Sequence, residues 1–317
     1  MDKNKVFVII HSNFIGDNLL TNSLVQNIKR LYKNSKVISV VQPEMAEVSK
    51  YQTGIDDVVI WDRKGKDKGF LKTVKFALNF PYKNIYACFP IYGMDRPVLL
   101  SRLLGAKYVL CPLQKTFSRL RNSIYPIPAK DKSCQENFAN LLKGITKEEI
   151  INEKIRFNVP KVESKIINNL PKSYNVLVLT STRKTKHIPI ETAYEVINNL
   201  KEEKFVLLGN SETAKEYSNL LKEKNYPNLI DLTNKTTLLE TFNIIKNAKS
   251  MITADTGLMH LACAVDTSFV SVFYEKDTVE YQPNEELYNC INITQNQTAE
   301  NIVNAFRKLN KEEMCLI

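Results

Sequence analysis

The stretch Asp255-Thr256-Gly257, followed by His260, carries groups that could bind an anion. It follows an apolar run at 251–254 and precedes a segment whose apolar residues recur at helical spacing. The free N–H groups of a first helical turn, with the Thr256 hydroxyl beside them, would form an anion site. Asp255 acting only as the N-cap of that helix explains the same residues without a ligand. The stretch therefore predicts either a phosphate-binding turn or a capped helix start.

A second candidate anion site follows the apolar run Val176–Leu179. The loop after this run contains Ser181, Thr182 and Lys186, and a helix is expected from Ile190. Hydroxyls and cations between a strand and a helix are the groups that a phosphate site needs.

The N-terminal half offers one acidic candidate, Asp17. The run Val6–Ile10 predicts a buried central strand, and a loop with Gly16 joins it to a helical pattern ending near Leu31. Ligands of open α/β sheets bind outside the carboxyl ends of the strands, where Asp17 is expected. Helix capping alone would explain an isolated aspartate here, and the position at the end of a strand keeps a catalytic role open beside it.

Basic residues in two predicted loops of this half could form a rim around a ligand site. They are Arg63, Lys64, Arg119 and Arg121. Solvation of the surface explains such charges without a ligand. The formal net charge of +10 suggests an anionic partner. Nucleic acid is not expected, because no dense basic block is interleaved with aromatic residues.

Apolar runs alternate with helical patterns along the whole chain, which predicts parallel sheets with helices on both faces. We expect an α/β protein of two Rossmann-like, doubly wound domains, residues 1–165 and 166–317, that face a central cleft. The expected linker is the polar stretch from Asn158 to Ser173. A return of the last helix to the first domain is left open.

Several familiar motifs are missing from the sequence. It has no G-x-G-x-x-G, no G-x-x-x-x-G-K and no Asp-x-Asp, which argues against a dinucleotide fingerprint, a P-loop and a carboxylate-pair metal site. The 6 cysteines form no C-x-x-C pair. No apolar run approaches the roughly 18 residues of a membrane span, and a reduced, cytoplasmic setting fits.

Three motifs, taken in order, resemble those of the lipopolysaccharide heptosyltransferase family, glycosyltransferase family 9, which has the GT-B fold. They are Ile15-Gly16-Asp17, Ser181-Thr182-Arg183-x-x-Lys186-His187-x-Pro189 and Asp255-Thr256-Gly257-x-x-His260-Leu261. The resemblance spans residue 6 to about 305. Thr236 and Ile188 depart from the family pattern, which has a methionine and a tryptophan there.

The resemblance implies a role for each motif. Asp17 would be the catalytic base of an N-terminal, acceptor-side domain. The C-terminal domain would bind the nucleotide sugar: Ser181, Thr182 and Lys186 would hold its phosphates, and Glu212 its ribose. Asp255 would contact the transferred sugar, Thr256 and Gly257 would present backbone N–H groups to the diphosphate, and His260 would lie on the same helical turn.

The implied reaction is metal-independent, inverting transfer of a heptose from ADP-heptose to a hydroxyl of the lipopolysaccharide inner core, without a cofactor. The implied acceptor is an anionic glycolipid at the inner membrane face, to which a cytoplasmic, peripheral enzyme would bind through the basic residues above. No nucleic acid or protein partner is implied. Two alternatives remain: a GT-B enzyme using another nucleotide sugar for capsule or another surface glycan, and a non-catalytic nucleotide-binding α/β protein.

Overall fold

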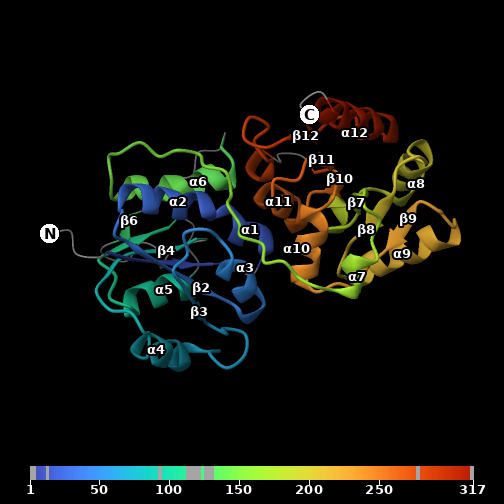
Figure 1. Ribbon diagram of the computed structural model, residues 1–317. Helices are drawn as coiled ribbons and strands as arrows, with labels where there is room; N and C mark the ends of the chain where they lie inside the picture. The colour runs from blue at the N-terminus through green and yellow to red at the C-terminus, as the bar shows by residue number, and fades with distance from the viewer. Residues whose placement is uncertain are drawn as a thin grey trace. The chain divides into compact units, whose positions relative to one another are not determined.

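The computed structural model describes residues 5–11, 14–91, 95–111, 123–124, 132–275 and 279–314. The chain folds into two compact units, Met1–Asn158 and Val159–Ile317 (Figure 1). Each unit is built on a six-stranded sheet in which the neighbouring strands pair parallel.

The first sheet has the strand order β3-β2-β1-β4-β5-β6. Its strands are β1 (Val6–Ile10), β2 (Lys36–Val41), β3 (Asp57–Ile60), β4 (Ile85–Pro90), β5 (Tyr108–Leu110) and β6 (Ser123–Ile124). The helices of this unit are α1 (Ile15–Leu20), α2 (Asn22–Leu31), α3 (Ala46–Lys50), α4 (Phe70–Leu78), α5 (Asp95–Leu103) and α6 (Cys134–Asn140). Helices α2 and α6 lie on one face of the sheet, and α4 and α5 on the other (Figure 1).

The second sheet has the order β12-β11-β10-β7-β8-β9. Its strands are β7 (Asn175–Val178), β8 (Phe205–Leu207), β9 (Leu229–Asp231), β10 (Met251–Ala254), β11 (Phe269–Val272) and β12 (Cys290–Ile293). Its helices are α7 (Lys165–Asn168), α8 (Ile190–Asn199), α9 (Glu212–Glu223), α10 (Leu238–Lys246), α11 (Gly257–Ala264) and α12 (Ala299–Met314). Helix α12, whose packing was left open above, packs against α8, β11 and β12 of its own unit.

Both sheets repeat the Rossmann strand order. In each, the order reverses between the first and fourth strands: between β1 and β4 in one unit, and between β7 and β10 in the other. The crevice at such a switch point, outside the carboxyl ends of the strands, is where open α/β sheets bind ligands. The strands beside each switch point are buried along most of their length, as their continuous apolar sequences predict.

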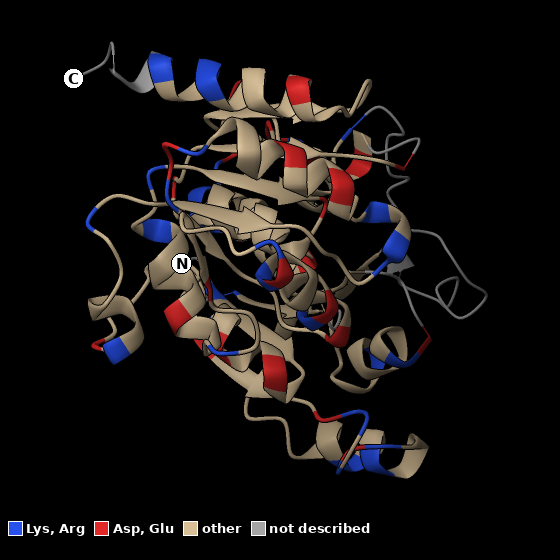
Figure 2. Cartoon of the chain, turned by 90° about the vertical axis from the view of Figure 1, so that its right-hand side faces the viewer, with Lys and Arg blue, Asp and Glu red and all other residues tan. Residues whose placement is uncertain are grey.

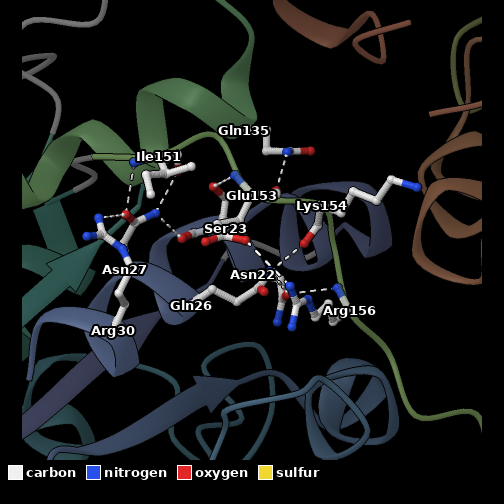
Figure 3. A network of polar contacts seen from close by, with 10 residues as sticks. All are labelled: Asn22, Ser23, Gln26, Asn27, Arg30, Gln135, Ile151, Glu153, Lys154 and Arg156. Atoms are coloured by element: carbon white, nitrogen blue, oxygen red, sulfur yellow. Dashed lines mark hydrogen bonds and ion pairs between the residues drawn. The ribbon is translucent and has the colours of Figure 1, made fainter. Parts of the chain in front are cut away.

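The segment expected as a linker is divided between the units. Residues 149–156 are held against α2 of the first unit by hydrogen bonds between side chains of α2 and the backbone (Figure 3). From residue 159 the chain belongs to the second unit, where the Asn243 side chain donates to the carbonyl of Pro160 at 3.0 Å. In the described part of the chain, no helix is both long and apolar enough to cross a bilayer.

Candidate active site

Asp17 lies in the first turn of α1, just beyond the carboxyl end of β1, and is buried. The N-cap of α1 is Phe14, whose backbone is extended and whose side chain makes no capping bond. Asp17 is therefore not the N-cap residue. The structure places its carboxyl group in the turn after β1, one of the two strands at the switch point of the first sheet.

A buried polar network fixes α1, and with it Asp17. The side-chain oxygen of Asn18 accepts a hydrogen bond from the Ser49 hydroxyl at 3.1 Å and another from the Gln52 amide. The backbone carbonyl of Asn18 accepts from the Thr21 hydroxyl at 2.7 Å. These bonds join α1 to α3 and to Gln52, two residues beyond its end, a link that the sequence analysis missed because the partners are about thirty positions apart.

His11, at the end of β1, is a neutral member of this network. Burial lowers the pKa of His11 from 6.5 to about 3. Its Nδ1 lies 3.5 Å from Thr21 Oγ1, whose proton is already donated to Asn18. Among the residues that the structure describes, no group forms a hydrogen bond with the buried Nε2 of this ring. Sequence reasoning did not single out His11.

In the second unit, Lys186 and Asp255 form a buried ion pair. Lys186 Nζ lies 2.5 Å from Asp255 Oδ2, and each side chain is less than a tenth exposed. Lys186 comes from the loop after β7 and Asp255 from the turn after β10, so the pair joins the two strands that flank the switch point. The N-cap of α11 is Thr256, without a side-chain capping bond, so the interpretation of Asp255 as N-cap is wrong.

Glu275 is a further carboxylate, and it contacts the loop that carries Lys186. The sequence analysis did not identify it. It lies three residues beyond the end of β11. Its oxygens accept hydrogen bonds from the Thr185 hydroxyl and from Arg183 Nη1, the latter at 3.2 Å, and Oε2 is 3.9 Å from Lys186 Nζ. Two hydrogen-bond donors and one lysine from residues 183–186 thus converge on the Glu275 carboxylate.

Two histidines support these loops. His260 is buried in α11, and its pKa is lowered to about 4, first by burial and then by the positive charge of Lys186. Its imidazole is therefore neutral and adds no positive charge beside Lys186. The His187 ring nitrogen Nε2 lies 2.8 Å from the Ser181 carbonyl oxygen, which fixes the backbone of that loop.

The remaining donor-side candidates border the same edge of the second sheet. Ser181, Thr256 and Gly257 are partly exposed and Thr182 is exposed, so their polar groups are accessible. Glu212 is the exposed first residue of α9, which follows β8 and is capped by Ser211. Thr236, one of the departures from the family pattern, is hydrogen-bonded to Thr241 at 2.9 Å between hydroxyl oxygens.

Of the four basic acceptor candidates, the structure describes Arg63 and Lys64; Arg119 and Arg121 lie outside the described residues. The Arg63 guanidinium lies 6.0 Å from the ring centre of the buried Trp61. Burial, and then the nearby charge of Arg96, lower its pKa. Arg96, which the sequence analysis missed, donates to the Arg63 carbonyl at 3.1 Å and to the Asp67 carbonyl at 3.1 Å, and so braces this loop.

The candidate residues that the structure describes lie at the carboxyl edges of the two sheets. The second unit brings a lysine, hydroxyls and a helix start together at its switch point, a set of groups suited to a diphosphate. Among the residues that the structure describes, no group of three or more His, Cys, Asp or Glu side chains could hold a metal ion.

A sequence model of glycosyltransferase family 9 (heptosyltransferase) matches residues 127–310, more than half of the chain. The chain belongs to this family. The matched range includes the loops of Lys186 and Asp255 and stops short of Asp17. No curated protein sequence matches the chain.

Solved structures show the same fold. A family 9 glycosyltransferase from Veillonella parvula is 16% identical, with a TM-score of 0.86 over 98% of this chain and 99% of that one. E. coli heptosyltransferase WaaC with ADP is 18% identical, with a TM-score of 0.75 over 96% and 99%. E. coli ADP-heptose lps heptosyltransferase II is 13% identical, with a TM-score of 0.73 over 98% and 99%. This family 9 protein thus has the two parallel-sheet α/β domains of the GT-B heptosyltransferases.

Proposed function

We propose that this protein transfers a heptose from ADP-heptose to a hydroxyl of the lipopolysaccharide inner core, with inversion at the anomeric carbon. The observation that carries the proposal is the group of donors at the switch point of the second sheet. There Lys186 lies against Asp255, beside the hydroxyl-rich loop after β7 and the start of α11. The family match covers this region, and similar structures are described with ADP and with ADP-2-deoxy-2-fluoro heptose.

Lys186 would hold the diphosphate as the leaving group gains negative charge. The hydroxyls of Ser181 and Thr182 and the N–H groups of Thr256 and Gly257 would add neutral donors, already held in place by folding. Preorganised donors of this kind stabilise developing charge, and removing one costs about 3 kcal/mol in comparable sites. Asp255, now paired with Lys186, would contact sugar hydroxyls, and Glu212 would bind the ribose.

Asp17 would act as the general base. The hydroxyl of a sugar acceptor has a pKa far above 7, so it needs a base as the bond to the anomeric carbon forms. A carboxylate on the side opposite the leaving group serves a direct displacement, which inverts the configuration. The network through Asn18, Gln52 and Ser49 would keep this carboxylate in place.

The proposed acceptor is an anionic glycolipid at the inner face of the membrane, reached by a cytoplasmic enzyme. Arg63, Lys64, Arg119 and Arg121 would bind its acidic groups. Arg63 and Arg96 both lie beside the Trp61 ring, 6.0 and 5.6 Å from its centre, and this gathering of positive charge supports the proposal, because it favours a bound anion.

A second candidate is transfer of another sugar from another nucleotide to a capsule or surface glycan. Thr236 and Ile188 favour it, since both replace family residues near the donor base and sugar. A thermal-shift panel of ADP, GDP, UDP and their sugars separates the two, because a ligand at about 100 times its Kd adds about 2.7 kcal/mol of stability. We expect the largest shift with ADP-heptose.

Transfer from ADP-heptose to an inner-core acceptor, followed by mass spectrometry, tests the reaction itself. We expect product formation to persist in excess EDTA, because Lys186 and the helix start supply the charge that a metal would. Stabilisation by UDP or GDP sugars alone would favour the second candidate. Inhibition by EDTA that added Mg²⁺ reverses would overturn the metal-independent mechanism.

A further inference from the structure

Helix α4 presents large apolar side chains to solvent. Phe70 is 63% exposed, Leu71 80% and Leu78 74%. Leu71, Lys75 and Leu78 follow one another at spacings of four and three residues, so they share the outward face of the helix. The opposite face is anchored, because Thr73 and Ala77 are buried. The register of the helix therefore fixes these leucines outward.

Lysines surround the exposed leucines. Lys72 and Lys75 are exposed on α4, and Lys64, Lys66 and Lys68 are exposed on the loop before it. In Figure 2, where α4 is the lowest helix, basic positions gather on the helix and on this loop. Residues 61–80 contain six basic and two acidic residues, a net charge of +4.

The lysine-bearing loop has a defined conformation. The Asp62 carboxylate accepts hydrogen bonds from the backbone N–H groups of Gly65 and Lys66, at 2.8 and 3.0 Å. The Asp67 carboxylate accepts from the N–H of Asp62 at 2.9 Å, and Arg96 donates to the Asp67 carbonyl. These bonds hold the loop beside α4 before any partner binds, so little ordering is needed on binding.

We propose that α4 and the preceding loop, residues 64–78, dock this protein on an anionic phospholipid surface. Exposed leucine and phenylalanine side chains can enter the region between head groups and acyl chains, while lysines bind lipid phosphates. Lysine suits this position because its apolar stem can lie along the membrane while the ammonium stays in water. A second copy of the chain fits this surface poorly, since pairing would bring two strongly positive surfaces together.

Docking would also orient the proposed site. The loop of Lys64 follows β3 and the turn of Asp17 follows β1, and these strands are parallel to β2 between them. Both segments therefore lie at the carboxyl edge of one sheet. A membrane-bound α4 would keep this edge close to lipid-linked acceptors. Only this step rests on the proposed function; the docking itself does not.

Co-sedimentation of the full-length protein with vesicles tests the proposal. We expect binding to phosphatidylglycerol–phosphatidylethanolamine vesicles, weak binding to phosphatidylcholine vesicles, and release at high salt. Near an anionic surface each lysine contributes about fivefold to partitioning, so Lys72→Gln with Lys75→Gln should weaken binding about 30-fold. Leu71→Ser with Leu78→Ser should weaken it at least about tenfold, because the apolar contacts are lost.

Matched variants on the second unit serve as controls. Lys201→Gln with Lys215→Gln removes the same charge from exposed positions, and Leu220→Ser removes an exposed leucine from α9. We expect both to bind vesicles like the parent. The α4 positions are exposed, so their variants should keep the parent melting temperature, and ADP binding by the same samples reports the donor site separately.

Two results would overturn the docking proposal. One is vesicle binding that the α4 variants and the control variants reduce equally, which would reflect net charge alone. The other is unchanged vesicle binding by the α4 variants together with a lower mass in sedimentation equilibrium. That outcome would assign α4 to contacts between copies of the chain.

Discussion

At the scale of single residues, Asp17 is the side chain on which the proposed transfer depends. Asp17→Asn keeps the size of the residue and removes its basicity. We expect turnover to fall by a factor of about 100 or more, the usual contribution of general-base catalysis. Melting temperature and ADP affinity should stay at parent values.

Asp95→Asn is the matched control, because Asp95 is an exposed aspartate in the first turn of α5. Initial rates with saturating donor and acceptor compare the two variants directly. Near-normal turnover by Asp17→Asn would show that Asp17 has only a structural role in α1 and that another residue is the base.

Glu275 and Lys186 should affect nucleotide binding in opposite directions. The Glu275 carboxylate now takes donors that a diphosphate would use and would repel its charge. Glu275→Gln should therefore tighten ADP binding several-fold, whereas Lys186→Ala should weaken it, because a charge-assisted bond to phosphate is lost. Calorimetric titration with ADP measures both changes.

Glu216→Gln is the control for charge, since Glu216 is exposed in the middle of α9. It removes the same charge from the same unit and should leave ADP affinity unchanged. If both glutamine variants bind ADP more tightly by the same factor, the effect of Glu275→Gln comes from the change in net charge and not from the position of Glu275. Lys186→Ala that binds ADP like the parent would remove Lys186 from the phosphate site.

Two buried histidines should lower the free energy of unfolding as the pH falls. The folded pKa is about 3 for His11 and about 4 for His260, both below the ordinary 6.5. Below pH 6.5 the unfolded chain binds protons that the folded chain does not, so stability falls as pH falls through this window. For His260 the loss reaches about 3 kcal/mol by pH 4.

Urea unfolding between pH 7 and pH 4 measures this dependence. His260→Gln should flatten it, because the variant has no group to protonate there. An unchanged pH dependence in this variant would mean that folding does not lower the pKa of His260.

At the scale of elements, the strands at the switch points were predictable from sequence. Central parallel strands are buried on both faces, so Val6–Ile10 and Val176–Leu179 appear as continuous apolar runs. The helix predicted up to Leu31 is in fact two, α1 and α2, with Thr21 between them. The Thr21 hydroxyl bonds to the Asn18 carbonyl, a local geometry that periodicity cannot reveal.

The contacts that complete the site were not predictable from sequence. Lys186 and Asp255 are 69 positions apart, and Glu275 meets Arg183 across 92. Sequence patterns report which face of a strand or helix is apolar, but not which distant loops meet. The motif residues could therefore be named as candidates, while Glu275, Arg96 and the capping residue of α11 came only from the structure.

Helix α2 binds the end of the first unit through polar side chains, which gives an element-scale prediction. The Asn27 amide donates to the Ile151 carbonyl at 2.8 Å and accepts from the Ile151 N–H at 3.0 Å (Figure 3). Asn27→Ala removes both bonds from a partly buried contact. We expect a loss of about 1–3 kcal/mol in unfolding free energy.

The control is Asn79→Ala, at an exposed asparagine that follows α4. Urea unfolding gives the free energies, and limited proteolysis should show faster cleavage near residues 149–156 in Asn27→Ala only. Equal stability of the two variants would show that water replaces the Asn27 bonds without loss.

At the scale of the whole molecule, two sheets of one topology carry different sets of candidate residues. The strand order reverses once in each sheet, and open α/β sheets bind ligands at such a point, so one fold provides two candidate ligand edges. The first edge carries Asp17 and the basic loop of Arg63, and the second carries Lys186, Asp255 and the start of α11. We infer that acceptor and donor are bound by separate units, and that changes in one unit should leave the other ligand's affinity intact.

The acceptor should be sensitive to charge on the first unit alone. Arg119 and Arg121 lie outside the described residues, and Lys64 is exposed on the loop after β3. Attraction of an anionic acceptor by such charges is screened beyond about 8 Å at physiological salt. Replacing Arg119 and Arg121 by glutamine should therefore raise the acceptor KM, flatten its dependence on salt and leave donor affinity unchanged.

Lys201→Gln with Lys215→Gln is the matched control, because it removes two charges from the second unit. Acceptor KM is measured for each variant at low and at physiological salt, with donor affinity taken from ADP titration. Steering by the basic loops predicts that only the arginine pair changes the salt dependence. If both variants raise the KM equally, total charge is responsible, and the assignment of the acceptor to the first unit loses its support.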